Sequence, residues 1–258
     1  MEVEEEHIHR PKLLSEEEGW LLFCKVAFVS SKGKCKDTEL ERVGKDILKK
    51  CGRLPLAFKT IGGLLSSKSQ LLSVWQPISE DLPQILANES KNHDSLLATL
   101  QLSYDELPLN LKQCILCFDY EIEVDQLANW WIEEGFVYNT GTKIARKMAF
   151  ECLSELISRC LVEAVRKRNY DRRVYSCKMH DMIREMIIRI AKEESFCSLD
   201  EKNANIATIH SRCLGVTNEA LLLPMDGNSK LRALLLTEAN ALASLGMLHW
   251  LKSSLSVF

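Results

Sequence analysis

Along most of this chain, apolar residues recur every three or four positions, which is the spacing of one face of an α-helix. The longest such run extends from Ile144 to Cys160, and another extends from Leu40 to Cys51. Gly52 follows the second run directly, where a glycine can take the left-handed conformation that ends helices. Pro55 suits the first turn of the next helix, because its missing N–H would have no intrahelical partner there. The pattern predicts a mainly α protein.

The periodicity changes after Cys160. Residues 161–165 and 173–177 have β-like composition, and a polar, basic run at 166–172 separates them. This arrangement predicts a β-hairpin with a basic tip. An amphipathic helix follows at once and continues to Ile190. Helices followed by a small hairpin are the ingredients of a winged helix.

We expect three parts in the chain: a helical bundle in residues 1–90, a winged-helix domain in 91–198 and the beginning of a leucine-rich repeat in 199–258. The polar stretch Lys91–Asp94 is the expected linker between the first two parts. Residues 212–216 and 230–236 look like short strands, and their spacing is compatible with the entry to a leucine-rich repeat.

Composition excludes several classes of protein. With 46% hydrophobic and 27% charged residues, the 258-residue chain can bury real cores. A net charge of −3 gives no global attraction to nucleic acid. The ten cysteines fall largely on apolar helix faces and follow no secretory signal, so we expect reduced thiols in a cytoplasmic protein. No uncharged apolar run reaches the roughly 18 residues that a membrane span requires.

Four short motifs occur in a fixed order: Leu54–Ala57 (Leu-Pro-Leu-Ala), Leu102–Pro108, Trp131–Val137 and Met179–Asp181 (Met-His-Asp). Their order and spacing resemble the NB-ARC leucine-rich-repeat disease resistance proteins of plants over roughly residues 10 to 195. The resemblance implies a helical bundle of the ARC1 type followed by the winged helix of that family.

Two segments resemble one class within the family. His9–Ser15 and Trp20–Phe28 look most like the coiled-coil receptors, and among these like the HopZ-activated receptor that forms a resistosome. The resemblance implies a part of an innate immune receptor that acts in plant defence.

The family is gated by nucleotide, being closed with ADP and open with ATP. Carried over, Pro55 would pack on the adenine, and His180 would contact the β-phosphate of ADP. Leu54, Leu56, Met179 and Asp181 would support these two motifs, and we expect Asp181 to cap the helix that follows. The implied partners are the remaining NB-ARC and leucine-rich-repeat domains, other receptor subunits, and proteins that sense pathogen effectors. We expect no catalytic residue, no metal and no nucleic acid.

Three departures from the family pattern limit this analogy. Arg53 stands where the proline motif begins with glycine, and Gly52 lies one position earlier. The segment 117–124 is shorter than usual and lacks a Pro-Glu-Asp. No G-x-x-x-x-G-K-[ST] phosphate loop occurs in the 258 residues. We therefore expect neither ATP hydrolysis nor tight ADP or ATP binding by this chain alone.

Other readings remain open. A basic hairpin tip, with Arg166 and Arg173 at its ends, could grip DNA and make the chain a winged-helix regulator, although a solvated tip explains it as well. An ATP hydrolase is the third class. Cys114, Cys117, Cys177 and His180 could together hold zinc, but packing on helix faces suffices to explain the cysteines.

Overall fold

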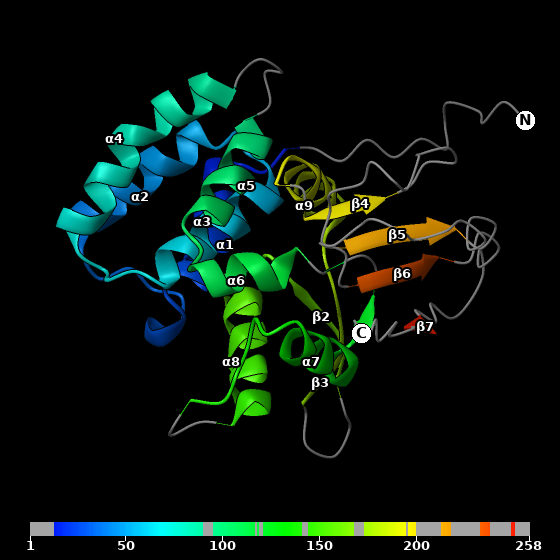
Figure 1. Ribbon diagram of the computed structural model, residues 1–258. Helices are drawn as coiled ribbons and strands as arrows, with labels where there is room; N and C mark the ends of the chain where they lie inside the picture. The colour runs from blue at the N-terminus through cyan, green and yellow to red at the C-terminus, as the bar shows by residue number, and fades with distance from the viewer. Residues whose placement is uncertain are drawn as a thin grey trace, which may run out of the picture. The chain divides into compact units, whose positions relative to one another are not determined.

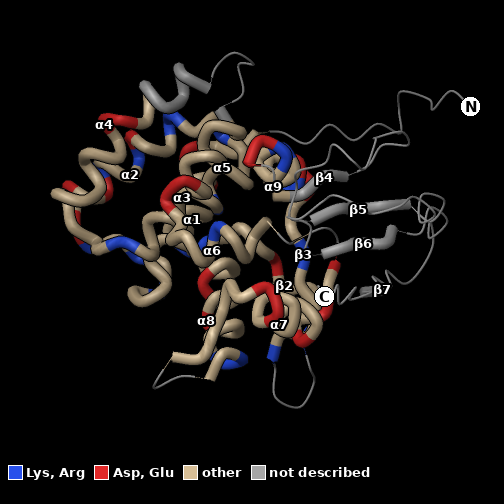
Figure 2. The backbone as a smooth tube through the Cα atoms, in the orientation of Figure 1, with Lys and Arg blue, Asp and Glu red and all other residues tan. Residues whose placement is uncertain are grey.

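The computed structural model describes residues 13–89, 95–116, 118, 121–140, 144–167, 173–194, 196–199, 213–217, 233–237 and 249–250. Helices predominate, which confirms the predicted mainly α class (Figure 1). The chain divides into two compact units, Met1–Leu107 with Ser158–Cys160, and Pro108–Ile157 with Leu161–Phe258. The predicted linker at 91–94 lies outside the described residues. Acidic and basic residues are interspersed along the helices (Figure 2).

The first unit consists of helices joined by short connections. Ser15 begins it with a reciprocal cap, since its Oγ accepts the backbone N–H of Glu18 at 3.2 Å and the Glu18 carboxylate accepts the N–H of Ser15 at 2.9 Å. Helix α1 packs on α3, α2 on α4, and α5 on both α3 and α4. The helices are α1 (Glu16–Ala27), the 3₁₀ turn η2 (Val29–Ser31), α2 (Thr38–Lys50), α3 (Pro55–Ser66), α4 (Leu72–Glu89) and α5 (Ser95–Asp105).

Aromatic side chains form the centre of this unit. Trp75 of α4 is fully buried, and its ring lies 5.9 Å from that of Phe23 and 5.4 Å from that of Phe28. Helix α5, which the sequence suggested would open the second domain, belongs by its contacts to this unit. The exact domain boundaries remain predictions.

A distant piece of chain completes the first unit. Residues Ser158–Cys160 group with it, and the backbone of Arg159 lies against Gly63 of α3. A Cβ at Gly63 would stand 2.4 Å from the carbonyl carbon and oxygen of Arg159, closer than atoms can approach. Gly63 therefore permits the Arg159 backbone to lie against α3, whereas a residue with a Cβ at this position would prevent that contact.

The second unit contains the small antiparallel sheet of a winged helix, with strand order β1-β3-β2. The predicted hairpin is confirmed, with β2 beginning at Glu163 and β3 at Val174, whereas its tip at 168–172 is outside the described residues. The first strand, in which Ile122 lies opposite Cys177, was not predicted from the sequence. The elements are α6 (Leu109–Ile115), β1 (Ile122–Glu123), α7 (Val124–Glu133), α8 (Ala145–Ser158), β2 (Glu163–Lys167), β3 (Val174–Lys178) and α9 (Asp181–Glu193).

A second sheet follows, with the order β4-β5-β6-β7. Its strands are β4 (Cys197–Leu199), β5 (Cys213–Thr217), β6 (Ala233–Thr237) and β7 (His249–Trp250). The first three are parallel and β7 is antiparallel to β6 (Figure 1). The two short strands predicted at 212–216 and 230–236 are therefore present as β5 and β6, while their membership in a leucine-rich repeat stays a prediction. Among the described residues, no helix has the length and apolar character needed to cross a membrane.

Candidate functional site

Pro55 is the first residue of α3 and is exposed in its unit. Leu54 precedes it with an extended backbone (φ −93°, ψ 135°) and provides no side-chain cap. Leu54 and Leu56 are half-buried, whereas Ala57 and Phe58 are buried and anchor the helix. Pro55 thus presents its ring outward on a helix start that its neighbours hold in place.

The turn before Pro55 contains two consecutive left-handed residues, Gly52 with φ +78° and Arg53 with φ +59°. For a non-glycine residue this backbone costs about 1 kcal/mol. The guanidinium of Arg53 donates from Nη2 and Nε to the carbonyl oxygen of Leu14, at 2.7 and 3.0 Å. The turn therefore keeps a conformation that glycine adopts readily, and Arg53 ties it to the residue that precedes the cap of α1.

A cavity of about 450 Å³ lies beside this turn. Trp20, Leu48 and Phe58 form apolar walls, and Arg53 contributes from the turn itself. The Nζ of Lys45 stands 5.5 Å from the centre of the Trp20 ring. The volume of the cavity falls within the range of small-molecule sites. Pro55 is not among the lining residues, so the cavity adjoins the proline motif without including its proline.

His180, the second predicted site residue, is exposed and is the N-cap of α9. Its Nδ1 accepts the backbone N–H of Met182 at 3.3 Å. The expectation that Asp181 caps this helix is wrong, because Asp181 is its first residue. With Nδ1 as acceptor, the neutral ring carries its proton on Nε2, so the ring can donate a hydrogen bond outward without becoming charged.

Two of the three residues before His180 lie in the interior of the unit. Met179 and Cys177 are buried, and the Cys177 thiol donates to the carbonyl oxygen of Ile122 at 3.8 Å. Burial raises the pKa of Cys177 to about 12, so the sulfur keeps its proton. Cys177 and His180 therefore do not face a common ligand. Within the described part of the chain, no three His, Cys, Asp or Glu side chains group as metal ligands, and Cys117 lies outside it.

Pro55 and His180 belong to different units, each exposed at a helix start in its own unit. An exposed proline ring offers an apolar surface with no N–H to desolvate, and His180 offers one directed donor. Both positions were predicted from the sequence. The role of Arg53 in the turn was not predicted, although an arginine between two predicted helices was the available signal.

Comparisons with known proteins identify the region. Residues 116–187 match the family model described as the disease resistance protein winged helix domain. The chain is 39% identical over 242 residues to disease resistance RPP13-like protein 4 of Arabidopsis thaliana, which covers 92% of this chain and 28% of that protein. It is 34% identical to disease resistance RPP8-like protein 3 and 32% identical to disease susceptibility protein LOV1, both also from Arabidopsis thaliana. Those two matches cover 88% and 92% of this chain, and 26% of each relative.

The chain thus spans about a quarter of the length of these relatives. Their names do not favour the alternative of a DNA-binding regulator. The match to the winged helix and the likeness of nearly the whole chain place it in the plant disease resistance protein family, as a segment that contains the family's winged helix domain.

Proposed function

We propose that this chain is the switch segment of an intracellular plant immune receptor gated by ADP and ATP. Its first unit would correspond to the ARC1 bundle, its winged helix to ARC2, and the sheet from β4 onward to the start of a leucine-rich repeat. Pro55 would contact the adenine and His180 the β-phosphate of ADP. The proposal gives the chain contacts to a nucleotide and no catalytic residue.

The observation that carries this proposal is the placement of His180. It is exposed at the start of α9, immediately after the sheet, and its Nδ1 is already used by Met182. A phosphate that reached this helix start would meet the Nε2 donor together with the positive end of the helix dipole. A structural histidine buried in a core would have neither the exposure nor the outward nitrogen.

The finer assignments rest on sequence resemblance. The Trp20–Phe28 segment supports the coiled-coil class and kinship with the HopZ-activated receptor. The partners that we propose are the nucleotide-binding and repeat domains of such a receptor, further receptor subunits, and proteins that sense pathogen effectors. The corresponding location is the cytoplasm.

A graft tests the proposal. The chain would be joined to the coiled-coil and nucleotide-binding regions of a related receptor, and His180→Ala compared with the unaltered graft at matched abundance. A hydrogen bond to a charged group is worth about 1.5–3 kcal/mol, so its loss would raise the open population by roughly 10- to 100-fold if the contact exists only in the closed state. The measurement is cell death in leaf tissue without an effector.

His180→Asn is the matched control. Asparagine is a good N-cap, so this variant keeps the helix start but removes the imidazole. Increased cell death with both variants supports the latch. If His180→Ala alone has an effect, or if neither variant signals while both accumulate stably, His180 caps α9 and does not hold a nucleotide.

A further inference from the structure

Two cysteines of the second unit, Cys114 of α6 and Cys152 of α8, have side chains that meet in its interior. Cys114 is 0% exposed and Cys152 is 7% exposed, and neither takes part in a disulfide. A hydrogen bond joins the two thiols. The cysteines are separated in sequence by β1 and α7, so the folding of the unit brings them together.

The side chain of Asn110 supports this placement independently. Its Nδ2 donates to Sγ of Cys152 at 3.6 Å. Asn110 and Cys114 are one helical turn apart on α6 and therefore lie on the same face of that helix. The Cys152 sulfur stands against this face. Because Asn110 is exposed, the sulfur lies within the length of one side chain of solvent.

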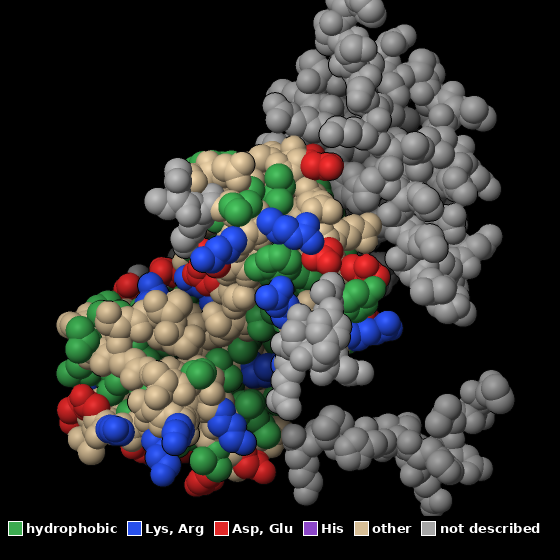
Figure 3. Space-filling view, turned by 90° about the horizontal axis from the view of Figure 1, so that it is seen from below, with side chains coloured by type: hydrophobic (Ala, Val, Ile, Leu, Met, Phe, Trp, Pro, Cys, Tyr) green, Lys and Arg blue, Asp and Glu red, His purple; other side chains and the backbone are tan. Residues whose placement is uncertain are grey.

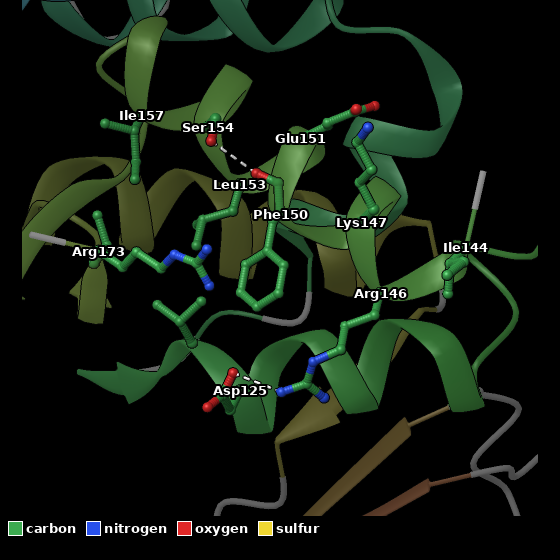
Figure 4. A pocket seen from close by; sticks show the side chains of 12 residues that line it. Asp125, Ile144, Arg146, Lys147, Phe150, Glu151, Leu153, Ser154, Ile157 and Arg173 are labelled. Atoms are coloured by element: carbon green, nitrogen blue, oxygen red, sulfur yellow. Dashed lines mark hydrogen bonds and ion pairs between the residues drawn. The ribbon is translucent and has the colours of Figure 1, made fainter. Parts of the chain in front are cut away.

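The opposite side of α8 faces a groove of about 950 Å³ (Figure 4). Phe150, Leu153 and Ile157 line this groove, and the Ser154 hydroxyl donates to the carbonyl oxygen of Phe150 at 2.8 Å. At 100° per residue, Cys152 lies on the other face of the helix from these residues. Its sulfur is therefore turned toward α6 and away from the groove.

The thiol of Cys152 ionises more readily than other buried thiols of the chain. The hydrogen bond with the Cys114 thiol holds the pKa of Cys152 below the usual value of 9.0, and the Asn110 amide acts in the same direction against the effect of burial. Burial raises the pKa of Cys24 to about 11 and that of Cys51 to about 12. Since the thiolate is the reactive form, Cys152 is the nucleophile of the pair.

We propose that Cys114 and Cys152 form a reversible oxidation site, which hydroperoxides convert to a disulfide. The Cys152 thiolate attacks one oxygen of hydrogen peroxide, which gives a sulfenic acid on Cys152 and releases hydroxide. The Cys114 sulfur then displaces the hydroxyl group of that sulfenic acid, which leaves as water with the Cys114 proton. In total, two thiols and one hydrogen peroxide give one disulfide and two waters. A dithiol reductant reverses the change by exchange.

The disulfide joins α6 to α8 across residues 114–152 and so prevents the two helices from separating. The described side chains on the face seen in Figure 3 carry both signs of charge beside apolar groups. Hydrogen peroxide is small and uncharged, so it is the probe that these surface charges influence least. The inference is independent of nucleotide binding by Pro55 and His180.

Peptide mapping by mass spectrometry tests the inference on the full, reduced chain treated with increasing hydrogen peroxide. We expect a Cys114–Cys152 cross-link to appear at lower doses than any oxidation of Cys24 or Cys51, and to disappear with dithiothreitol. Fragment spectra distinguish Cys114 from Cys117 within the same peptide. The inference is overturned if Cys152 stays reduced while other cysteines oxidise, or if it pairs with a different cysteine.

Three variants examine the two steps separately, with circular dichroism to show that each is folded. Cys114→Ser removes the second thiol, so the sulfenic acid on Cys152 should accumulate and react with dimedone. Asn110→Ala keeps both cysteines but should slow cross-linking at neutral pH by at least about twofold, because the pKa of Cys152 rises without the amide donor. Cys35→Ser is the matched control, since it removes a half-buried thiol of the first unit and should leave the rate unchanged.

The variants can also contradict the inference. Loss of the cross-link in Cys35→Ser would mean that oxidation reaches Cys152 through another thiol. An unchanged rate in Asn110→Ala would mean that the amide does not activate Cys152. Either result would overturn the assignment of Cys152 as the residue that reacts first.

Discussion

The ring of His180 accepts the backbone N–H of Met182 through Nδ1, at 3.3 Å, and so caps helix α9. Histidine is not among the preferred capping residues, which are Asn, Asp, Ser and Thr. The same side chain must therefore serve the helix and any external ligand through different nitrogens. This division of roles can be tested on the isolated chain.

Replacing His180 by Ala should lower the free energy of unfolding by about 0.5–1 kcal/mol, because the first turn of α9 loses its acceptor. His180→Ser should retain most of that stability. Urea unfolding followed by circular dichroism measures both. Equal stability of the alanine variant and the unaltered chain would mean that water replaces the cap without cost.

Nucleotide titration of the isolated chain should give no binding in the micromolar range for ADP or ATP. Pro55 and His180 would supply two contacts, whereas tight phosphate binding requires several backbone N–H groups and a lysine, and the 258-residue sequence contains no phosphate-loop motif that would provide them. Calorimetry with each nucleotide is the measurement. A micromolar Kd for either nucleotide would contradict the expectation.

Two glycines should respond to alanine for different reasons. Gly63→Ala improves helix propensity by about 1 kcal/mol, but its Cβ would meet the Arg159 backbone at 2.4 Å, so we expect a net loss of about 1–3 kcal/mol. Gly135 has φ +74° and no atom near an added Cβ, so Gly135→Ala should cost about 1 kcal/mol through backbone strain alone. Thermal unfolding distinguishes them. If the Gly63→Ala variant is more stable than the unaltered chain, the Arg159 backbone does not lie against position 63.

The ionised carboxylate of Asp46 should make a small contribution to the free energy of unfolding that is lost at low pH. Hydrogen bonds from Lys50 at 2.7 Å and from Ser79 at 2.6 Å hold the pKa of its carboxyl below the usual value of 3.8. A carboxyl whose pKa is lowered by folding stabilises the protein at pH values above its pKa in the unfolded chain. This stability is lost as the pH falls through the pKa of the folded state. The side chain is 51% exposed, so we expect less than about 1 kcal/mol.

Asp46→Asn should lose this contribution at neutral pH and show a flatter decline in stability below about pH 4. Urea midpoints measured at several pH values would test it. Parallel pH profiles for the two proteins would indicate that Asp46 titrates alike in the folded and unfolded states.

Much of the fold follows from local sequence. Helix α2 occupies nearly the residues that its periodicity indicated, and α3 begins at Pro55, the residue expected in its first turn. Strand β1 could not be predicted because two residues carry no periodicity, and its two residues are defined as a strand by pairing with Cys177 and Ser176 of β3. The grouping of α5 with the first unit depends on contacts distant in sequence, which no local pattern reports.

The candidate site was predictable in its positions and not in its geometry. The Leu-Pro-Leu and Met-His-Asp motifs pointed to Pro55 and His180. Neither motif indicates which residue caps α9, because the choice between His180 and Asp181 depends on where the backbone turns from extended to helical. The left-handed backbone of Arg53 could not be predicted either, because non-glycine residues rarely adopt this conformation.

The return of Ser158–Cys160 to the first unit has a practical consequence for dissecting this protein. No single cut of the chain separates the two units, because a fragment ending at Leu107 would lack the peptide that covers Gly63. A limited digest that cleaves only near residue 107 should therefore leave both products associated through that peptide. An independently folding first unit would have to be made by joining the missing three residues back to it through a linker.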